Sequence, residues 1–137
     1  MYLVPVMIEQ TALVVTKWQY QPQANLIEPD ETKLSGLISL DVMKKRAPTK
    51  KGIACRFTCT FAYSNEPLLE YVAEDSYVID LDDVIDKNEL QTMIRNTYTK
   101  FKEAFDFRKM GTFLHNIPLQ HFDETRYDLE PILQLLQ

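Results

Sequence analysis

The side chains best suited to chemistry are two cysteines and two histidines. Cys55 and Cys59 lie four residues apart where apolar and polar residues alternate, so an extended strand points both to one face, about 13 Å apart. A disulfide needs Cα atoms within about 7 Å, which excludes a bond between them inside one strand. His115 and His121 are the remaining soft ligands, which does not favour a zinc site. We expect two small buried thiols in a reducing compartment.

Charged clusters give a second set of candidates. The four aspartates between residues 80 and 86 suggest calcium, but the glycine and final glutamate of an EF-hand loop are absent, and acidic residues also favour the start of a helix. The basic residues between Lys44 and Lys51 either contact an acidic partner or form a solvated turn that blocks pairing of a sheet edge. We favour the helix start and the solvated turn.

The motifs of common enzyme families are missing from this sequence. Its glycines are Gly36, Gly52 and Gly111, which excludes the glycine-rich loops that bind dinucleotides or nucleoside triphosphates. No serine stands in a G-x-S-x-G context. We therefore expect a protein that is not an enzyme and needs no cofactor.

Length and charge narrow the class of protein further. The chain has 137 residues, of which 45% are apolar and 26% charged, as expected for one globular domain spanning residues 1–137. The net charge is −5, with +2 in residues 1–66 and −7 in residues 67–137, which argues against nucleic-acid binding. The apolar opening, Met1–Ile8, is too short for a signal peptide, and no uncharged run approaches the roughly 18–20 residues that span a bilayer. We expect a soluble, cytoplasmic protein without membrane insertion.

The elements that must position these residues begin with strands. Four stretches show apolar alternation or β-branched and aromatic enrichment: Leu13–Tyr20, Lys33–Lys44, Gly52–Tyr63 and Leu68–Leu81. Their connections are short, and short connections favour antiparallel neighbours. The pattern predicts a four-stranded antiparallel β-meander, with a turn at Ser64–Pro67.

The period then changes to that of a helix. Apolar residues recur every three or four positions from Lys87 to about Arg108, and Asp86 with Glu89 forms a capping-box pattern before them. Gly111 is a natural residue to end this helix. An irregular apolar segment, residues 112–122, precedes a last short helix that Asp128 caps. The fold class is therefore α+β, with a β-meander followed by a long helix and a short C-terminal helix.

Several strands carry apolar residues on both faces. Leu37 and Met43 lie opposite the Leu34 face of the second strand, and Val72 and Val78 lie opposite Tyr77 in the fourth. One long helix covers only one face of a sheet. Apolar groups on the other face therefore predict a further layer, which a chain of this length obtains from another subunit.

The order of elements resembles that of the SecB-like export chaperones, over roughly residues 12–136. The best local match is the segment from Met110 to Phe122, where glycine and phenylalanine lead to an apolar-proline pair and another phenylalanine. Leu68–Val72, running on to Tyr77–Ile79, is similar in character to the last strand of that family. The chain would be a divergent member, since Asp75-Ser76 replaces a glycine-rich step and the family's proline-containing helix motif has no counterpart.

The resemblance implies an ATP-independent holdase chaperone that binds unfolded or non-native polypeptides, with export as one role. It implies a homo-oligomer, either dimer or tetramer, and a translocase motor or an antitoxin client as further partners. The alternative is a dedicated interaction or scaffold module on the same fold, with one partner and no general chaperone activity. An extended client would be held by apolar side chains and backbone hydrogen bonds.

Two sets of residues are candidates for such binding. Aromatic and apolar residues are the candidates for a client-peptide groove, with burial in the core as the alternative for each: Phe57, Phe61, Tyr77, Phe105, Phe107, Phe113 and Leu114. Acidic residues near the family's motor-docking position are the candidates for a partner surface: Glu70, Glu74 and Asp75.

Overall fold

The computed structural model describes residues 9–10, 12–22, 30–46, 48–120, 122 and 124–136. Predictions about Met1–Ile8 and His121 lie outside these residues. The elements of the sheet are β1 (Glu9–Gln10), β2 (Val14–Tyr20), β3 (Leu34–Arg46), β4 (Lys50–Tyr63) and β5 (Glu66–Asp80). The helices are α1 (Lys87–Arg108) and α2 (Glu130–Leu136), with 3₁₀ turns at Glu31–Lys33, Lys109–Gly111 and Glu124–Arg126. The α+β class, the antiparallel sheet, the long helix and the short terminal helix are as predicted.

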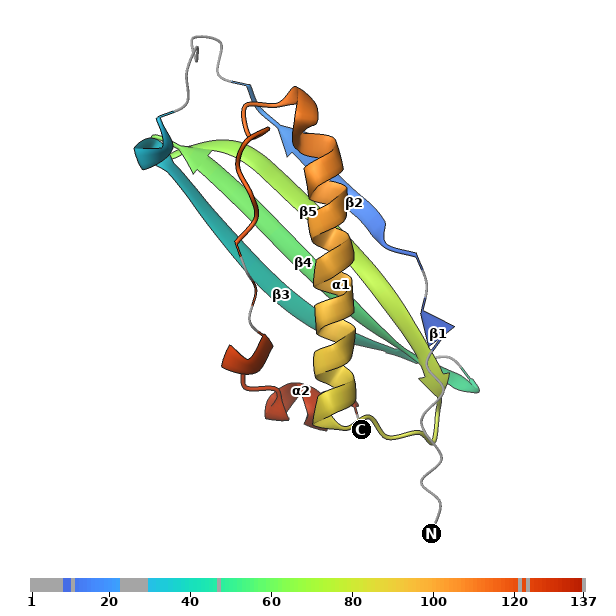
Figure 1. Ribbon diagram of the computed structural model, residues 1–137. Helices are drawn as coiled ribbons and strands as arrows, with labels where there is room; N and C mark the ends of the chain where they lie inside the picture. The colour runs from blue at the N-terminus through green and yellow to red at the C-terminus, as the bar shows by residue number, and fades with distance from the viewer. Residues whose placement is uncertain are drawn as a thin grey trace.

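The sheet and the long helix form two layers. The helix α1 runs across one face of the twisted sheet, and the segment after it returns over the same face towards α2 (Figure 1). The other face of the sheet is not covered by any helix in the described part of the chain. We call the covered face the inner face and the other the outer face.

The order of the strands differs from the predicted meander at one strand. The three long strands β3, β4 and β5 are consecutive antiparallel neighbours, but β2 pairs with β5 instead of β3, and β1 continues along the same edge of β5. Residues 21–33 separate the two strands in the sequence, and this length allows β2 and β3 to lie at opposite edges of the sheet. This placement lets the Trp18 ring pack against Tyr71 and Phe105, with ring centroids 5.3 Å and 6.2 Å away.

The turn between β4 and β5 is tighter than the predicted Ser64–Pro67. Ser64 and Asn65 both adopt positive φ, at 50° and 66°, and Tyr63 pairs directly with Glu66 across them. This is the geometry that matches the right-handed twist of two long strands. Pro67 lies inside β5, where the register shifts opposite Ala62, so it marks an irregularity in the strand and does not break it.

The hydrophobic core lies between the inner face and α1. Every second residue of β4 is buried there, including Cys55 and Cys59 as the alternation predicts. Tyr71 stacks on Phe101 in this core, with ring centroids 4.2 Å apart and an interplanar angle of 13°. The core thus takes most of the aromatic side chains of the chain.

The ends of α1 show one prediction confirmed and one wrong. At the start, the Asp86 carboxylate accepts the Glu89 N–H at 2.8 Å and the Glu89 side chain accepts the Asp86 N–H, which completes the capping box. At the other end, no glycine has positive φ, so Gly111 is not a left-handed cap. The helix tightens into a 3₁₀ turn, and Thr112 supplies the hydrogen bonds to the Lys109 carbonyl that such a glycine would otherwise provide.

The last helix follows its predicted pattern. Asp128 accepts the N–H of Glu130 at 3.2 Å, Pro131 lies in the first turn, and Leu133 and Leu136 are buried. Neither helix of the described chain combines the length and the apolar composition that crossing a membrane requires.

Candidate functional site

Strand β3 forms an edge of the sheet. It pairs with β4 on one side, and no described strand pairs with its other side. None of its residues is buried, whereas β4 and β5 bury alternate residues along most of their length. A long strand of the described chain therefore has one side on which its backbone groups do not pair with another strand.

The first half of β3 lacks the usual protection of such an edge. Natural proteins block open edges with charged residues, proline or bulges. The run Leu34–Leu40 contains none of these, and its first charged neighbours are Lys33 and Asp41. The second half differs, because Lys44, Lys45 and Arg46 follow there.

A hollow of about 550 Å³ lies mainly on the outer face, where its lining extends from this uncharged run across β4 and β5 to Gln19 and Gln21. Its apolar floor comes from Leu37, Ala62 and Pro67, and polar groups stand around it on Gln19 and Glu70. Leu37 is the prominent apolar group here, with 68% of its surface exposed. The hollow is open to solvent and large enough to receive an apolar side chain of another molecule.

A second, smaller hollow of about 140 Å³ lies on the inner side of the same strand. It is enclosed between β3 and residues 117–120, with Leu34, Ile38 and Cys59 among its walls. Gly36, Leu37 and Phe61 belong to both hollows. The two hollows therefore meet at the edge strand, one on each side of it.

Gly36 has a steric role at this meeting point. A Cβ added there would lie 2.9 Å from Cε1 of Phe61, closer than real contacts allow. The absence of a side chain lets the Phe61 ring lie under the strand, where it stacks on Phe105 at 6.0 Å between centroids. The glycine thus allows the Phe61 ring to keep its place against the strand.

The segment over the inner hollow is held by side chains from three elements. Tyr98 of α1 donates to the carbonyl of Gln120, and Lys109 Nζ donates to that of Ile117 at 2.9 Å. Tyr20 of β2 accepts the N–H of Phe113 at 2.9 Å. Burial raises the pKa of Tyr98 to about 12, so its hydroxyl stays a donor at neutral pH.

The acidic residues of the outer face lie in ion pairs. Lys17 is 2.6 Å from Glu70 beside the larger hollow, and Arg56 is 3.0 Å from Glu74 further along. Both glutamates are on the outer face, as a partner surface would require. Their charge is largely balanced by neighbours, so this region is close to neutral.

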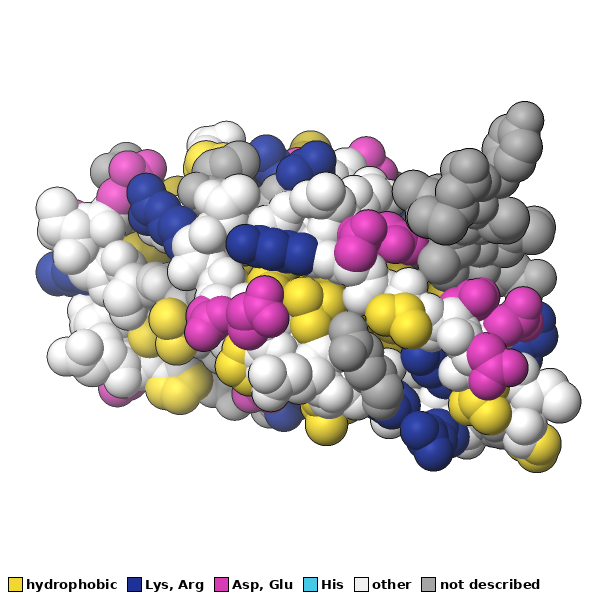
Figure 2. All heavy atoms as spheres, turned by 90° about the horizontal axis from the view of Figure 1, so that it is seen from below, with side chains coloured by type: hydrophobic (Ala, Val, Ile, Leu, Met, Phe, Trp, Pro, Cys, Tyr) yellow, Lys and Arg dark blue, Asp and Glu magenta, His cyan; other side chains and the backbone are white. Residues whose placement is uncertain are grey.

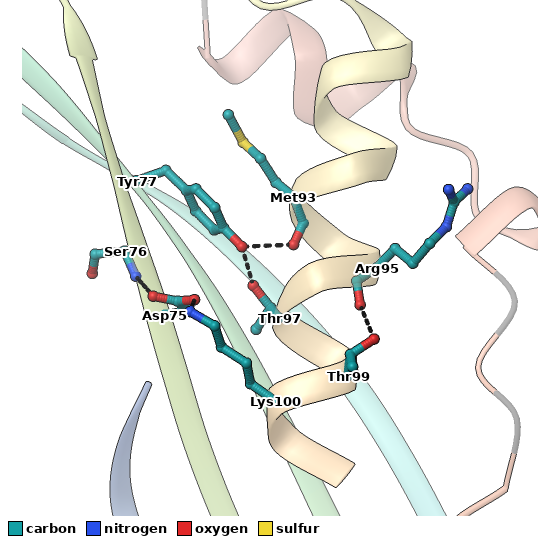
Figure 3. Close-up of polar contacts among 8 residues, drawn as sticks. All are labelled: Asp75, Ser76, Tyr77, Met93, Arg95, Thr97, Thr99 and Lys100. Carbon is teal, nitrogen blue, oxygen red and sulfur yellow. Dashed lines mark hydrogen bonds and ion pairs between the residues drawn. The ribbon is translucent and has the colours of Figure 1, made fainter. Parts of the chain in front are cut away.

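Asp75 does not belong to that surface, which corrects the prediction. Its side chain is 0% exposed and points to the inner face, where it accepts from Lys100 Nζ at 3.1 Å and from the Ser76 N–H at 2.9 Å (Figure 3). Alternation along β5 places Asp75 opposite in direction to Glu70 and Glu74. It fastens α1 to the sheet instead of facing a partner.

Most of the predicted groove residues are core residues. Five of them are buried with at most 8% exposure, and α1 and the segment after it cover them: Phe57, Phe61, Tyr77, Phe105 and Leu114. Of these, only Phe61 reaches the two hollows. Phe113 is half-buried against Tyr63, and Phe107 is 84% exposed on α1. The predicted set is therefore not brought together as one groove.

The basic turn between β3 and β4 has a structural role at the other end of the molecule. Lys44 and Lys51 donate to the carbonyls of Leu135 and Leu136 at 3.3 and 3.1 Å, which secures the end of α2. Lys51 is 4% exposed, so the prediction of a solvated turn is wrong for this residue. Figure 2 shows this end of the molecule, where apolar side chains are exposed between acidic and basic ones.

Comparisons with known proteins place the fold. No family model matches the sequence, and no curated protein is similar to it. Among solved structures, the SecB-like chaperone Rv1957 of Mycobacterium tuberculosis, in complex with a ChAD peptide from the antitoxin HigA1 (Rv1956), matches with a TM-score of 0.50. The match covers 84% of this chain and 90% of that one, at 12% identity. The chain therefore has the SecB-like fold that its sequence resembles.

A second solved structure is similar over a comparable length. It is a protein of unknown function from Streptococcus agalactiae, with a TM-score of 0.48 and 11% identity, covering 88% of this chain and 99% of that one.

Proposed function

We propose that this protein binds segments of other polypeptides, as an ATP-independent holdase chaperone of the SecB-like type. The observation that carries the proposal is the pair of hollows on the two sides of the uncharged edge strand, both lined by Gly36 and Leu37. Apolar hollows beside free backbone groups suit a polypeptide, because its side chains can be buried while its backbone forms hydrogen bonds.

The likeness in fold supports the same proposal. The similar Mycobacterium structure holds a peptide from an antitoxin, which is a polypeptide ligand on this architecture. Among the described residues, no three His, Cys, Asp or Glu side chains gather where they could hold a metal ion.

Assembly with further copies is part of the proposal. The outer face carries Met43, Val72 and Val78 as half-buried residues, and none of them lines the outer hollow. Burying these groups would need a second protein layer, and a second subunit is the simplest source. A dimer or tetramer would also present several hollows to one long client, which raises overall affinity without new contacts.

A dedicated single-partner module is the second candidate. The peptide in the similar structure comes from one named antitoxin, so a narrow preference is compatible with this fold. Aggregation assays with several unrelated unfolded proteins separate the two candidates. A holdase keeps all of them in solution near equimolar ratio, whereas a dedicated module protects none of them and binds one partner.

Leu37 provides the variant that links this activity to the site. Leu37→Ser removes a large apolar side chain of the outer hollow that is 68% exposed, and Phe107→Ser removes an apolar side chain elsewhere that is 84% exposed. We expect the first to reduce protection against aggregation and the second to leave it unchanged. Equal effects of the two changes would contradict the assignment of the site.

A further inference from the structure

We infer that the bound segment adds to β3 as a further strand of the sheet, and that it is an extended, uncharged stretch of about seven residues. This inference rests on the proposed function and specifies the partner for the same site. Its observation is the open side of β3 along Leu34–Leu40, with a hollow on each face of the sheet beside it.

The backbone argument comes first. The described chain leaves the outer side of β3 without a strand partner. The opposite edge of the sheet is formed by the shorter strands β1 and β2, and the register of β2 shifts between Val15 and Lys17. Unpaired N–H and C=O groups along a strand are a template for one more strand. Among the described strands, β3 therefore offers the longer and more regular edge for strand addition.

The side-chain argument explains why hollows occur on both sides. Successive side chains of a strand point to opposite faces of the sheet. A strand added beside Gly36 and Leu37 would send one side chain towards the inner hollow and the next towards the outer hollow. The 140 Å³ hollow suits a branched aliphatic side chain, and the 550 Å³ hollow suits an aromatic one.

Charge sets the limits of the segment. Lys33 stands before the uncharged run and Asp41 after it, and the ion pairs of the outer face leave no strong field of either sign between them. A charged residue in the middle of the bound segment would lose hydration without gaining a partner. Uncharged, alternating apolar sequences are therefore preferred.

The test uses a synthetic peptide with an unmodified backbone, acetyl-Lys-Thr-Thr-Val-Phe-Thr-Thr-Lys-amide, and two N-methylated forms. One form carries methyl groups on every second amide, and the other carries them on the remaining amides. In an added strand only one set of amides faces β3, so we expect one form to lose about tenfold or more in affinity and the other to bind like the parent. An equal effect of the two forms overturns the inference.

Hydrogen exchange followed by NMR gives a second readout. Strand addition protects the amides of alternate residues between Leu34 and Leu40, because the other amides already face β4. A change spread evenly over the run, or confined to residues 117–120, overturns the inference.

A matched pair of substitutions tests the position of the strand. Ser39 and Thr58 are direct neighbours on the outer face, but Ser39 is on the edge strand and Thr58 is inside the sheet. We expect Ser39→Lys to weaken peptide binding about tenfold, as edge lysines do, and Thr58→Lys to change it less than about twofold. The reverse order overturns the inference.

Three outcomes distinguish failure of this inference from failure of the proposed function. If neither the peptide nor any unfolded protein binds, the proposed function itself fails. If unfolded proteins bind but the two methylated forms behave alike, only strand addition fails. If Ser39→Lys converts a dimer into a monomer, the edge pairs with a second copy, and the inference is overturned.

Discussion

The ammonium of Lys100 lies 3.1 Å from Oδ2 of Asp75, whose side chain is completely buried. This pair joins the middle of α1 to β5, and Figure 3 shows Asp75 receiving the Ser76 N–H on its other oxygen. Asp75 and Ser76 lie between the stretches of β5 that pair with β1 and with β2. The carboxylate thus satisfies a backbone donor close to the step between those two strands.

Removing the ammonium should destabilise the fold. Lys100→Met leaves a buried carboxylate without its cation, and we expect the free energy of unfolding to fall by about 2 kcal/mol, less than for a fully buried pair because Lys100 is 36% exposed. Asp75→Asn in the same background should recover part of the loss, since the amide oxygen still accepts the Ser76 N–H. Urea denaturation measures both. An unchanged midpoint for Lys100→Met would show that the pair does not stabilise the fold.

The glycines provide an internal comparison. A Cβ at Gly36 meets the Phe61 ring at 2.9 Å, whereas one at Gly111 meets nothing within 4 Å. We expect Gly36→Ala to cost about 1 kcal/mol, because the ring must shift. Gly111→Ala should be neutral or stabilise by about 0.5 kcal/mol, because it restricts the unfolded chain. Thermal unfolding of the two variants measures this difference. A larger loss of stability in Gly111→Ala than in Gly36→Ala would contradict the prediction.

The buried thiols predict a dependence of stability on alkaline pH. Burial raises the pKa of Cys55 and of Cys59 from 9.0 to about 12. Between these values the unfolded chain has lost protons that the folded chain retains, so the free energy of unfolding falls as pH rises above 9 and is unaffected by the thiols below it. The slope is about 1.4 kcal/mol per pH unit for each thiol.

Chemical denaturation at pH 8 and pH 10 measures this loss. Buried tyrosines such as Tyr98 act in the same direction, so the thiol share is isolated with the double variant Cys55→Ala, Cys59→Ala. The loss between the two pH values should be smaller in the variant than in the natural sequence. An equal loss would mean that the thiols are solvated in the folded protein.

Local sequence signals predicted the helices well. The bounds of α1 follow from its capping residues and its apolar period, both of which are contained within a few neighbouring residues. The place of β2 could not be predicted in this way, because pairing with β5 depends on contacts far apart in the sequence. Short connections between the other strands favour a meander, and the long connection at residues 21–33 permits either edge of the sheet.

The candidate site was harder to predict for a related reason. Alternation correctly placed Phe57 and Phe61 on one face of β4. It cannot show that α1 covers that face, so that most of its aromatic side chains are buried in the core. The uncharged run Leu34–Leu40 was visible in the sequence, but its importance depends on β3 being an edge strand. The burial of Asp75 could not be predicted for the same reason, because its ion-pair partner Lys100 lies on another element.

The most direct test of the proposed function is the native mass in solution, measured by light scattering with and without an unfolded client. The account predicts a mass near two or four times 16.0 kDa that rises stoichiometrically with a reduced, unfolded protein and not with its folded form. The rise should be smaller in Leu37→Ser and unchanged in Phe107→Ser. A protein that ignores the unfolded client, at whatever oligomeric state, would contradict the account.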